Sequence, residues 1–243
     1  KYFVHSFPFL VVGSVMSSNQ CPGERRGAHW HIWRAADELN ASPLLETESG
    51  KTRYSRLLPS VTAILENWGH RWAGDDEWQS FLNKATLKHE VEEALVALST
   101  LLEWLEAADN SAATGTVTLL DVCAGKGTLA MLLSYLSATG PDSPFSKAWS
   151  RISKIIMIEK MSINWHHIAA ANEDCGNRLQ TDESQASRDL CKDNSQGDML
   201  LGAIPIEIWA GCNVHDESIV ERLQALQGQL IMVGIHLCKT LSP

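Results

Sequence analysis

A short segment between two apolar runs carries the residues best suited to bind a ligand. It reads DVCAGKG and covers 121–127, with Asp121 at its start and Gly125 and Gly127 near its end. Glycines at this spacing allow a sharp turn from a strand into a helix, and they let a ligand approach the backbone. Turns of this kind bind the nucleoside part of a cofactor in many α/β proteins. The segment therefore predicts a nucleoside-binding turn.

Two phosphate-binding patterns can be compared with this turn. A P-loop needs a glycine, four further residues and then Gly-Lys-Ser/Thr. Leu120 stands at its first glycine and Gly127 at its hydroxyl residue, so the P-loop pattern fails twice. The dinucleotide pattern G-x-G-x-x-G/A is matched by Gly125, Gly127 and Ala130. Dinucleotide binding is therefore one interpretation of the turn.

A third pattern, acid-x-G-x-G-x-G, is typical of turns that bind S-adenosylmethionine. Asp121, Gly125 and Gly127 match it, and Cys123 replaces the first glycine. The acid at position 121 distinguishes a dinucleotide from S-adenosylmethionine. A carboxylate repels the anionic pyrophosphate of a dinucleotide, and it attracts the ammonium and sulfonium groups of the methyl donor. We therefore favour the methyl donor, with NAD and a purely structural turn as the alternatives.

Residues after two later strands complete the predicted site. The strand-like run at 153–160 ends in Glu159 and Lys160. A carboxylate at the end of this strand can accept hydrogen bonds from the ribose hydroxyls of either cofactor. Asp216 follows the next strand at the predicted start of a helix, where it can cap the helix or accept from an adenine amino group. We count Glu159, Lys160 and Asp216 among the cofactor-binding residues.

The elements that position these residues follow from the hydrophobic pattern. After residue 115, strand-like runs alternate with helical segments, which indicates βαβ units and a parallel sheet. The expected strands are 116–122, 153–160, 204–214 and 229–238, and the expected helices are 127–138, 164–174 and 216–227. The polar stretches 140–150 and 176–198 are expected loop insertions. The predicted fold class is α/β, with a Rossmann-like, mostly parallel sheet that stops after its fourth strand and is C-terminally incomplete.

The residues before this sheet have a helical pattern. Helices are expected at 29–40, 55–72 and 75–108. Apolar residues recur every three or four positions along the last of these, at Leu87, Val91, Leu95, Leu98, Leu102 and Leu105. The chain begins with Lys, and its first apolar stretch is too short and interrupted to span a membrane. The predicted organisation is a leader or disordered segment over 1–27, a helical region over 28–112 and a Rossmann-like methyltransferase domain over 113–243.

Composition excludes several classes of protein. The 243 residues carry a net charge of −9, which argues against non-specific nucleic-acid binding. The six cysteines form no C-x-x-C pair, and the adjacent His166 and His167 point in different directions on a helix, so we predict no metal site. Reduced thiols indicate an intracellular protein, most simply a cytoplasmic one, with organelle targeting left open.

Three segments together resemble a known family. They are LLDVCAGKGTLAMLLSYL at 119–136, IIMIEKM at 155–161 and IMVGIHLCKTLSP at 231–243. These segments resemble the broad S-adenosylmethionine-dependent methyltransferase-domain family that includes tRNA 2'-O-methyltransferases and related methyltransferase-like proteins. Members carry His-x-Cys, often followed by Gly, at the end of the fourth strand. Here the element is His236 and Cys238, with Lys239 in place of the glycine.

The resemblance implies a Rossmann-like fold and S-adenosylmethionine as the methyl donor. It implies that the turn faces the donor, Glu159 its ribose and Asp216 its adenine. It also implies that His236 and Cys238 line the catalytic cleft. The turn residues concerned are Asp121, Cys123, Ala124, Gly125 and Gly127. The chain lacks the Cys/His zinc cluster of the tRNA enzymes, so the identity of the acceptor does not transfer.

The predicted function is therefore that of an S-adenosylmethionine-dependent methyltransferase. Its acceptor is unknown, with RNA as one candidate, its oligomeric state is open, and no membrane partner is expected. His236 is the candidate base if the acceptor must lose a proton early. Two alternatives remain, an NAD-dependent oxidoreductase and a non-catalytic Rossmann-like interaction module.

Overall fold

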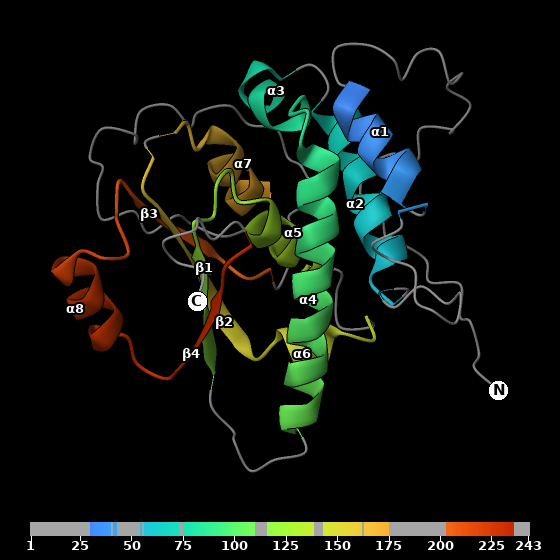
Figure 1. The fold of residues 1–243 in the computed structure, drawn as a ribbon. Helices are drawn as coiled ribbons and strands as arrows, with labels where there is room; N and C mark the ends of the chain where they lie inside the picture. Colours follow the sequence, from blue (N-terminus) through green and yellow to red (C-terminus); the bar gives the residue numbers. More distant parts are fainter. Residues whose placement is uncertain are drawn as a thin grey trace.

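A parallel sheet forms the centre of the molecule (Figure 1). The structure is a computed structural model. The structure describes residues 30–39, 41–42, 54, 56–72, 75–109, 116–138, 143–161, 163–174 and 203–235. The strands are β1 (Val117–Val122), β2 (Ile152–Glu159), β3 (Ile206–Ala210) and β4 (Gln229–Val233). They lie in the order β3-β2-β1-β4, and every neighbouring pair is parallel. The predicted α/β class with a Rossmann-like parallel sheet is confirmed.

Helices cover both faces of this sheet. Leu119, Ile155 and Met157 face the layer that contains α5 (Thr128–Ser137) and α7 (His166–Asp174). The alternate residues Leu120 and Ile156 face α8 (Glu217–Ala225) on the other side. A strand covered on both faces is apolar at successive positions. This explains why β1 and β2 read as continuous apolar runs.

A second helical layer lies over the outer side of α5. It consists of α1 (Trp30–Leu39), α2 (Leu58–Arg71), α3 (Asp76–Leu82) and α4 (Leu87–Asp109), with α4 next to α5 in Figure 1. The predicted apolar stripe of α4 is confirmed, because all six of its residues are buried. These side chains form one continuous core with α5 and the sheet. No described helix is both long enough and apolar enough to cross a bilayer.

Several element boundaries differ from the sequence-based expectation. The helix expected over 75–108 is two helices, because α3 ends at its C-cap Asn83 and α4 begins at Leu87. The loop expected at 140–150 contains a one-turn helix, α6 (Ser146–Trp149), whose Trp149 is buried in the core. The expected leader, the polar stretch 176–198 and the boundary at 112 lie outside the described residues.

The shared core leads to a prediction for Trp68 of α2. Its ring is fully buried and lies 5.3 Å from the ring of Tyr135 in α5, measured between centroids. Trp68→Ala should leave a cavity and lower the free energy of unfolding by about 3–5 kcal/mol. The helices and the sheet should still unfold in one transition. Urea titration monitored by circular dichroism and by fluorescence measures this transition. Trp104→Ala, at a side chain that is 38% exposed, is the control; two separate transitions would contradict the shared core.

Candidate functional site

The turn between β1 and α5 has an unusual backbone. Cys123, Gly125 and Gly127 have φ angles of 58°, 57° and 78°, all in the left-handed region. A side chain in this region costs roughly 1–2 kcal/mol, so glycine is the usual residue there. Cys123 stands where the acid-x-G-x-G-x-G pattern has its first glycine, and it adopts the conformation that a glycine would adopt. All three glycine positions of that pattern therefore share one backbone conformation.

The two glycines of the turn have different surroundings. A Cβ atom on Gly127 would lie 2.6 Å from Cε of Met157 and 3.0 Å from Cδ1 of Ile168. Gly127 thus allows close packing of α5 and α7 on the sheet. A Cβ atom on Gly125 would meet no atom within 4 Å. A purely structural explanation therefore fits Gly127, whereas Gly125 borders open space that a ligand can approach.

Asp121 lies under the turn, near the end of the central strand β1. It pairs in register with Met157 of β2 and Val233 of β4, and it is only 2% exposed. Its Oδ2 atom has no hydrogen-bond partner among the described residues. Burial raises the pKa of Asp121 to about 7, and the negative charge of Glu159 contributes to the increase. A carboxyl group that titrates near neutral pH therefore lies beside the turn.

Glu159 connects the end of β2 to the same turn. Its Oε2 accepts a hydrogen bond from the backbone N–H of Gly125 at 2.9 Å, and its Oε1 accepts one from Met161 at 2.8 Å. The backbone N–H groups of Cys123 and Ala124 donate to the carbonyl of Ile158 at 3.0 and 3.4 Å. The structure thus brings together the predicted residues Asp121, Cys123, Ala124, Gly125, Gly127 and Glu159.

The remaining predicted residues lie further out. Lys160 is exposed directly after β2, and Asp216 is exposed at the N-cap of α8, where its side chain makes no capping hydrogen bond. The N–H of Cys212 donates to the carbonyl of Glu159 at 3.2 Å, which places the chain after β3 beside the end of β2. His236 and Cys238 lie outside the described residues, so their roles stay predictions.

His167 was not predicted to contribute, yet it holds the turn in place. Its Nε2 lies 2.7 Å from the carbonyl oxygen of Lys126. A carbonyl only accepts, so Nε2 donates and carries the proton of the neutral ring. Burial lowers the pKa of His167 to about 4. The ring also stacks on Phe81 of α3, with centroids 5.1 Å apart. The sequence pattern bears on His167 only as a possible metal ligand and does not indicate this contact.

Glu90 of α4 is a second residue that the sequence interpretation missed. Its carboxylate is buried, and Oε2 accepts a hydrogen bond from Oγ1 of Thr128, the first residue of α5, at 3.0 Å. Its Oε1 accepts from Oγ1 of Thr86 at 2.9 Å and forms an ion pair with Lys84. Glu90 lies between two stripe residues of α4 and three residues after Leu87, so helical periodicity could have indicated that it faces inward.

The surroundings of the turn are therefore rich in carboxylates. Asp121 and Glu159 lie on the strand side, where neither forms an ion pair among the described residues. Glu90 lies on the helix side, where Lys84 neutralises it. The Nζ of Lys126 points away from the strands and donates to the carbonyl of Ser80 in α3. The strand side of the turn is negative and favours a positively charged ligand.

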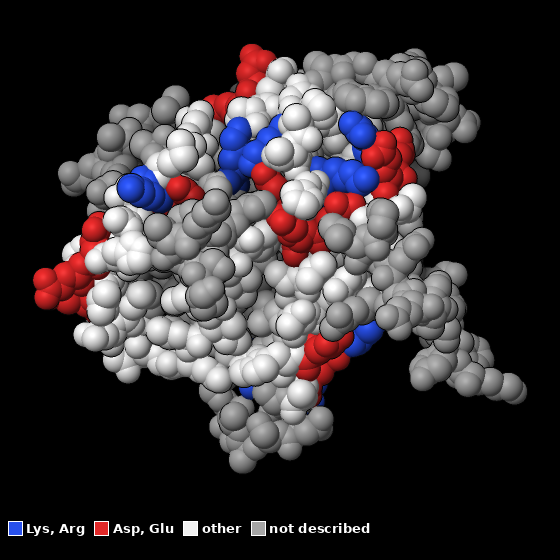
Figure 2. Space-filling model, viewed as in Figure 1, with Lys and Arg blue, Asp and Glu red and all other residues white. Residues whose placement is uncertain are grey.

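A separate hollow of about 260 Å³ lies between α1 and α4. It is lined by His31, Arg34, Ala85, Lys88, His89 and Glu92. Its cationic side chains are paired, with Arg34 and Lys88 lying 2.9 and 3.3 Å from Glu38. Figure 2 shows basic and acidic side chains next to one another in this region. Because its cationic side chains are already paired, the hollow is a weaker candidate for a ligand-binding site than the turn.

Neither a metal cluster among the described residues nor a similar protein indicates what the site binds. Within the described ranges, no group of three or more His, Cys, Asp and Glu side chains is placed to hold a metal ion. Comparison of the chain with protein-family models, curated proteins and solved structures finds no match. A functional assignment therefore depends on the geometry of the turn.

The different surroundings of the two glycines can be tested by alanine substitution. Gly127→Ala should lower the free energy of unfolding by about 2–4 kcal/mol, because backbone strain and the contact with Met157 add together. Gly125→Ala should cost only about 1–2 kcal/mol, because the strain acts alone. Urea unfolding of both variants provides the comparison. Equal losses would contradict the different roles of the two glycines.

The burial of Asp121 predicts a pH-dependent stability difference. Between about pH 4 and 7, the folded protein keeps a proton on Asp121 that the unfolded chain releases, so this group lowers stability as pH rises. Asp121→Asn removes the effect. Its stability relative to the unmodified protein should rise with pH by at most about 1.4 kcal/mol per unit and level off above pH 7.

Urea unfolding at pH 4.5, 6.0 and 7.5 measures this difference. His167 has the opposite dependence, since its lowered pKa makes the folded state gain stability as pH rises from about 4 to its unfolded value. That contribution is common to both proteins and cancels when they are compared. A stability difference that stays constant would show that Asp121 titrates normally, and one that shrinks as pH rises would show that its pKa is lowered.

Proposed function

We propose that the turn between β1 and α5 binds S-adenosylmethionine and that the protein is a methyltransferase. The observation that carries this proposal is the pair of carboxyl groups on the strand side of the turn. Asp121 is buried without a partner for Oδ2, and Glu159 is hydrogen-bonded to the turn itself. The ammonium and sulfonium groups of the donor are positive and would offset this charge.

The same geometry counts against dinucleotide binding. In dinucleotide-binding folds the pyrophosphate lies at the N-terminus of the helix that follows the glycine turn. Here that helix is α5, and the carboxylate of Glu90 is hydrogen-bonded to its first residue at 3.0 Å. A pyrophosphate there would meet this carboxylate. The NAD-dependent alternative is therefore the weaker one.

A non-catalytic interaction module is also less well supported. Packing alone explains Gly127 but gives no reason for the left-handed Gly125 next to open space. Packing also gives no reason for an acid at position 121, because burial without a partner is unfavourable for a carboxyl group. Both features are expected if a ligand lies against the turn.

The proposal assigns a role to each part of the site. The turn would bind the methionine portion of the donor, and Glu159 would accept from the ribose with lone pairs that its two backbone donors leave unused. The segment 211–213 and Asp216 are the candidates for the adenine, because Cys212 is hydrogen-bonded to the end of β2.

Methyl transfer itself requires little chemistry from the protein. The acceptor displaces the donor sulfur at the methyl carbon, so the protein contributes mainly proximity and alignment. A base is needed only if the acceptor must lose a proton early, and His236 remains the candidate. RNA remains one candidate acceptor.

Isothermal titration with S-adenosylhomocysteine tests the proposal. The unmodified protein should bind with micromolar affinity, and Asp121→Asn should weaken binding at least tenfold, because the buried charge opposite the donor's ammonium group is lost. Asp76→Asn removes an exposed acid at the start of α3 and should leave the affinity unchanged. NADH should give no heat of binding.

The outcomes separate the alternatives. A folded protein that binds neither compound would favour the interaction module. Tight NADH binding with none of the methyl-donor product would favour the oxidoreductase. Equal losses in the two asparagine variants would show a general charge effect rather than a role for Asp121.

A further inference from the structure

The backbone of the turn does not stabilise the ionised form of Asp121. Four N–H groups of the turn donate to other acceptors, those of Cys123 and Ala124 to Ile158, that of Gly125 to Glu159 and that of Gly127 to Ala124. Asp121 itself is 2% exposed, and its Oδ2 has no hydrogen-bond partner among the described residues. Burial without donors disfavours a carboxylate more than it disfavours the protonated acid.

The elements packed around Asp121 add a second negative charge. The strand β4 and the helix α5 carry no charged residue. On β2, Glu159 raises the pKa of Asp121 further after burial, the main cause. On α7, burial keeps His167 uncharged near neutral pH by lowering its pKa to about 4, and the exposed His166 lies 3.5 Å from Glu77 of α3. Within these elements, nothing neutralises the two carboxyl groups.

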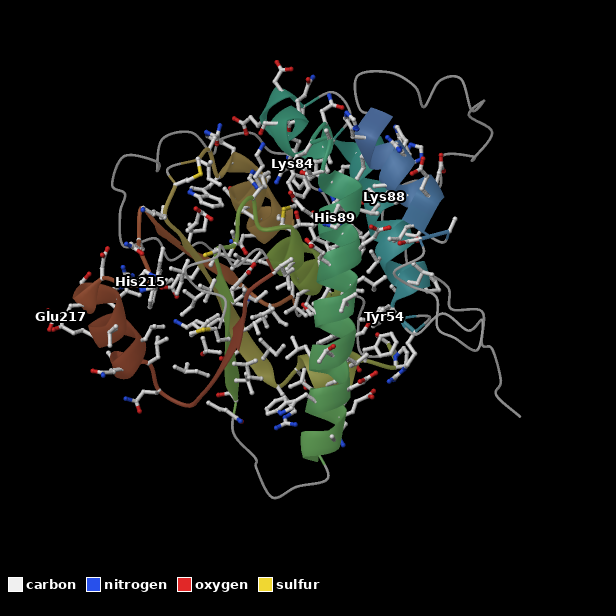
Figure 3. All side chains as sticks on the ribbon, viewed as in Figure 1. Tyr54, Lys84, Lys88, His89, His215 and Glu217 are labelled. Carbon is white, nitrogen blue, oxygen red and sulfur yellow. The ribbon has the colours of Figure 1, made fainter. Side chains whose placement is uncertain are left out.

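The lysines around the turn are directed elsewhere. The Nζ of Lys126 donates to a backbone carbonyl of α3. Figure 3 shows Lys84 at the corner between α3 and α4, where it pairs with Glu90. Lys160 is exposed directly after β2. Among the described residues, then, no lysine pairs with Asp121, and a positive ligand is the charge that can favour its ionised form.

We propose that Asp121 holds a proton in the ligand-free protein and releases it to solvent when the positive groups of a nucleoside lie against the turn. Ligand binding is then coupled to the loss of one proton, and this coupling favours cationic nucleosides over uncharged ones. The inference rests on the proposed function, because it assumes that the turn binds the methyl donor or its product. It adds that pH regulates the affinity of this site.

The ligand does not have to touch Asp121 for this coupling. Glu159 already acts on Asp121 through its charge, while its Oε2 accepts from the N–H of Gly125 at 2.9 Å. The side of Gly125 on which a Cβ would lie is open, with no atom within 4 Å. A cation in this space would act on Asp121 as Glu159 does, with the opposite sign.

The coupling predicts how ligand affinity changes with pH. Below about pH 7 the ligand must displace the proton of Asp121, so the affinity for S-adenosylhomocysteine should rise by up to about tenfold per pH unit. Above that pH the acid is already ionised, and the affinity should level off. Asp121→Asn has no proton to release. Its loss of affinity relative to the unmodified protein should therefore be larger at pH 8.0 than at pH 6.0.

Isothermal titration of S-adenosylhomocysteine into three full-length proteins at pH 6.0 and 8.0 tests the inference. Titration in two buffers with different enthalpies of ionisation gives the number of protons released. The unmodified protein should release about one proton more than Asp121→Asn at pH 6.0 and about the same number at pH 8.0. Asp76→Asn, at an exposed acid of α3, should match the unmodified protein. Protons from the ligand are common to all three proteins and cancel.

The outcomes distinguish this inference from the proposed function. Binding of S-adenosylhomocysteine with equal proton release by the unmodified protein and Asp121→Asn at pH 6.0 overturns the inference and leaves the proposed function standing. An equal rise with pH in the affinity for adenosine, which is uncharged, also overturns it. A folded protein that binds no S-adenosylhomocysteine at either pH contradicts both. If Asp121→Asn does not fold, the unmodified protein decides, because equal affinities at the two pH values overturn the inference.

Discussion

The left-handed backbone between β1 and α5 is the constraint on which the other layers depend. It directs the chain from the central strand back over the sheet, and α5 then forms the surface on which α4 and α2 pack. The constraint is met in two ways. Cys123 tolerates a conformation that costs it free energy, whereas Gly127 has no room for a side chain next to Met157. One local conformation therefore determines both the packing of the layers and the shape of the candidate site.

Three helices, α3, α4 and α7, support the glycine turn in return. His167 of α7 donates to the carbonyl of Lys126, Lys126 donates to the carbonyl of Ser80 in α3, and Glu90 of α4 accepts from Thr128. These polar contacts range from the buried Glu90–Thr128 pair to the exposed Lys126–Ser80 pair, and they have directional geometry that apolar packing lacks. They hold the glycine turn from the side opposite the strands. The candidate site thus depends on α3, α4 and α7 as much as on the sheet.

The sheet and most helices could be predicted because they follow from short-range patterns. Continuous apolar runs indicate strands covered on both faces, and the stripe of α4 has the helical period. The break between α3 and α4 was missed because helical patterning continues across it. The positions of Asp121 and Glu159 could be predicted because parallel strands end at the same sheet edge. Helical periodicity indicates the inward face of Glu90, but the partners of Glu90 and His167 could not be predicted, because these contacts join residues 38 and 41 positions apart and depend on tertiary packing.

The burial of Asp121 links stability to ligand charge. A carboxyl group that is 2% exposed and lacks a partner for Oδ2 destabilises the folded state, and Glu159 increases that cost by raising its pKa further. An uncharged residue at position 121 would avoid the cost and keep the turn. A cation against the turn would instead stabilise both carboxylates, so binding should release protons near neutral pH. A neutral or anionic ligand would leave this cost in place or add to it. The electrostatics of the turn therefore support a cationic nucleoside more strongly than its glycine spacing does.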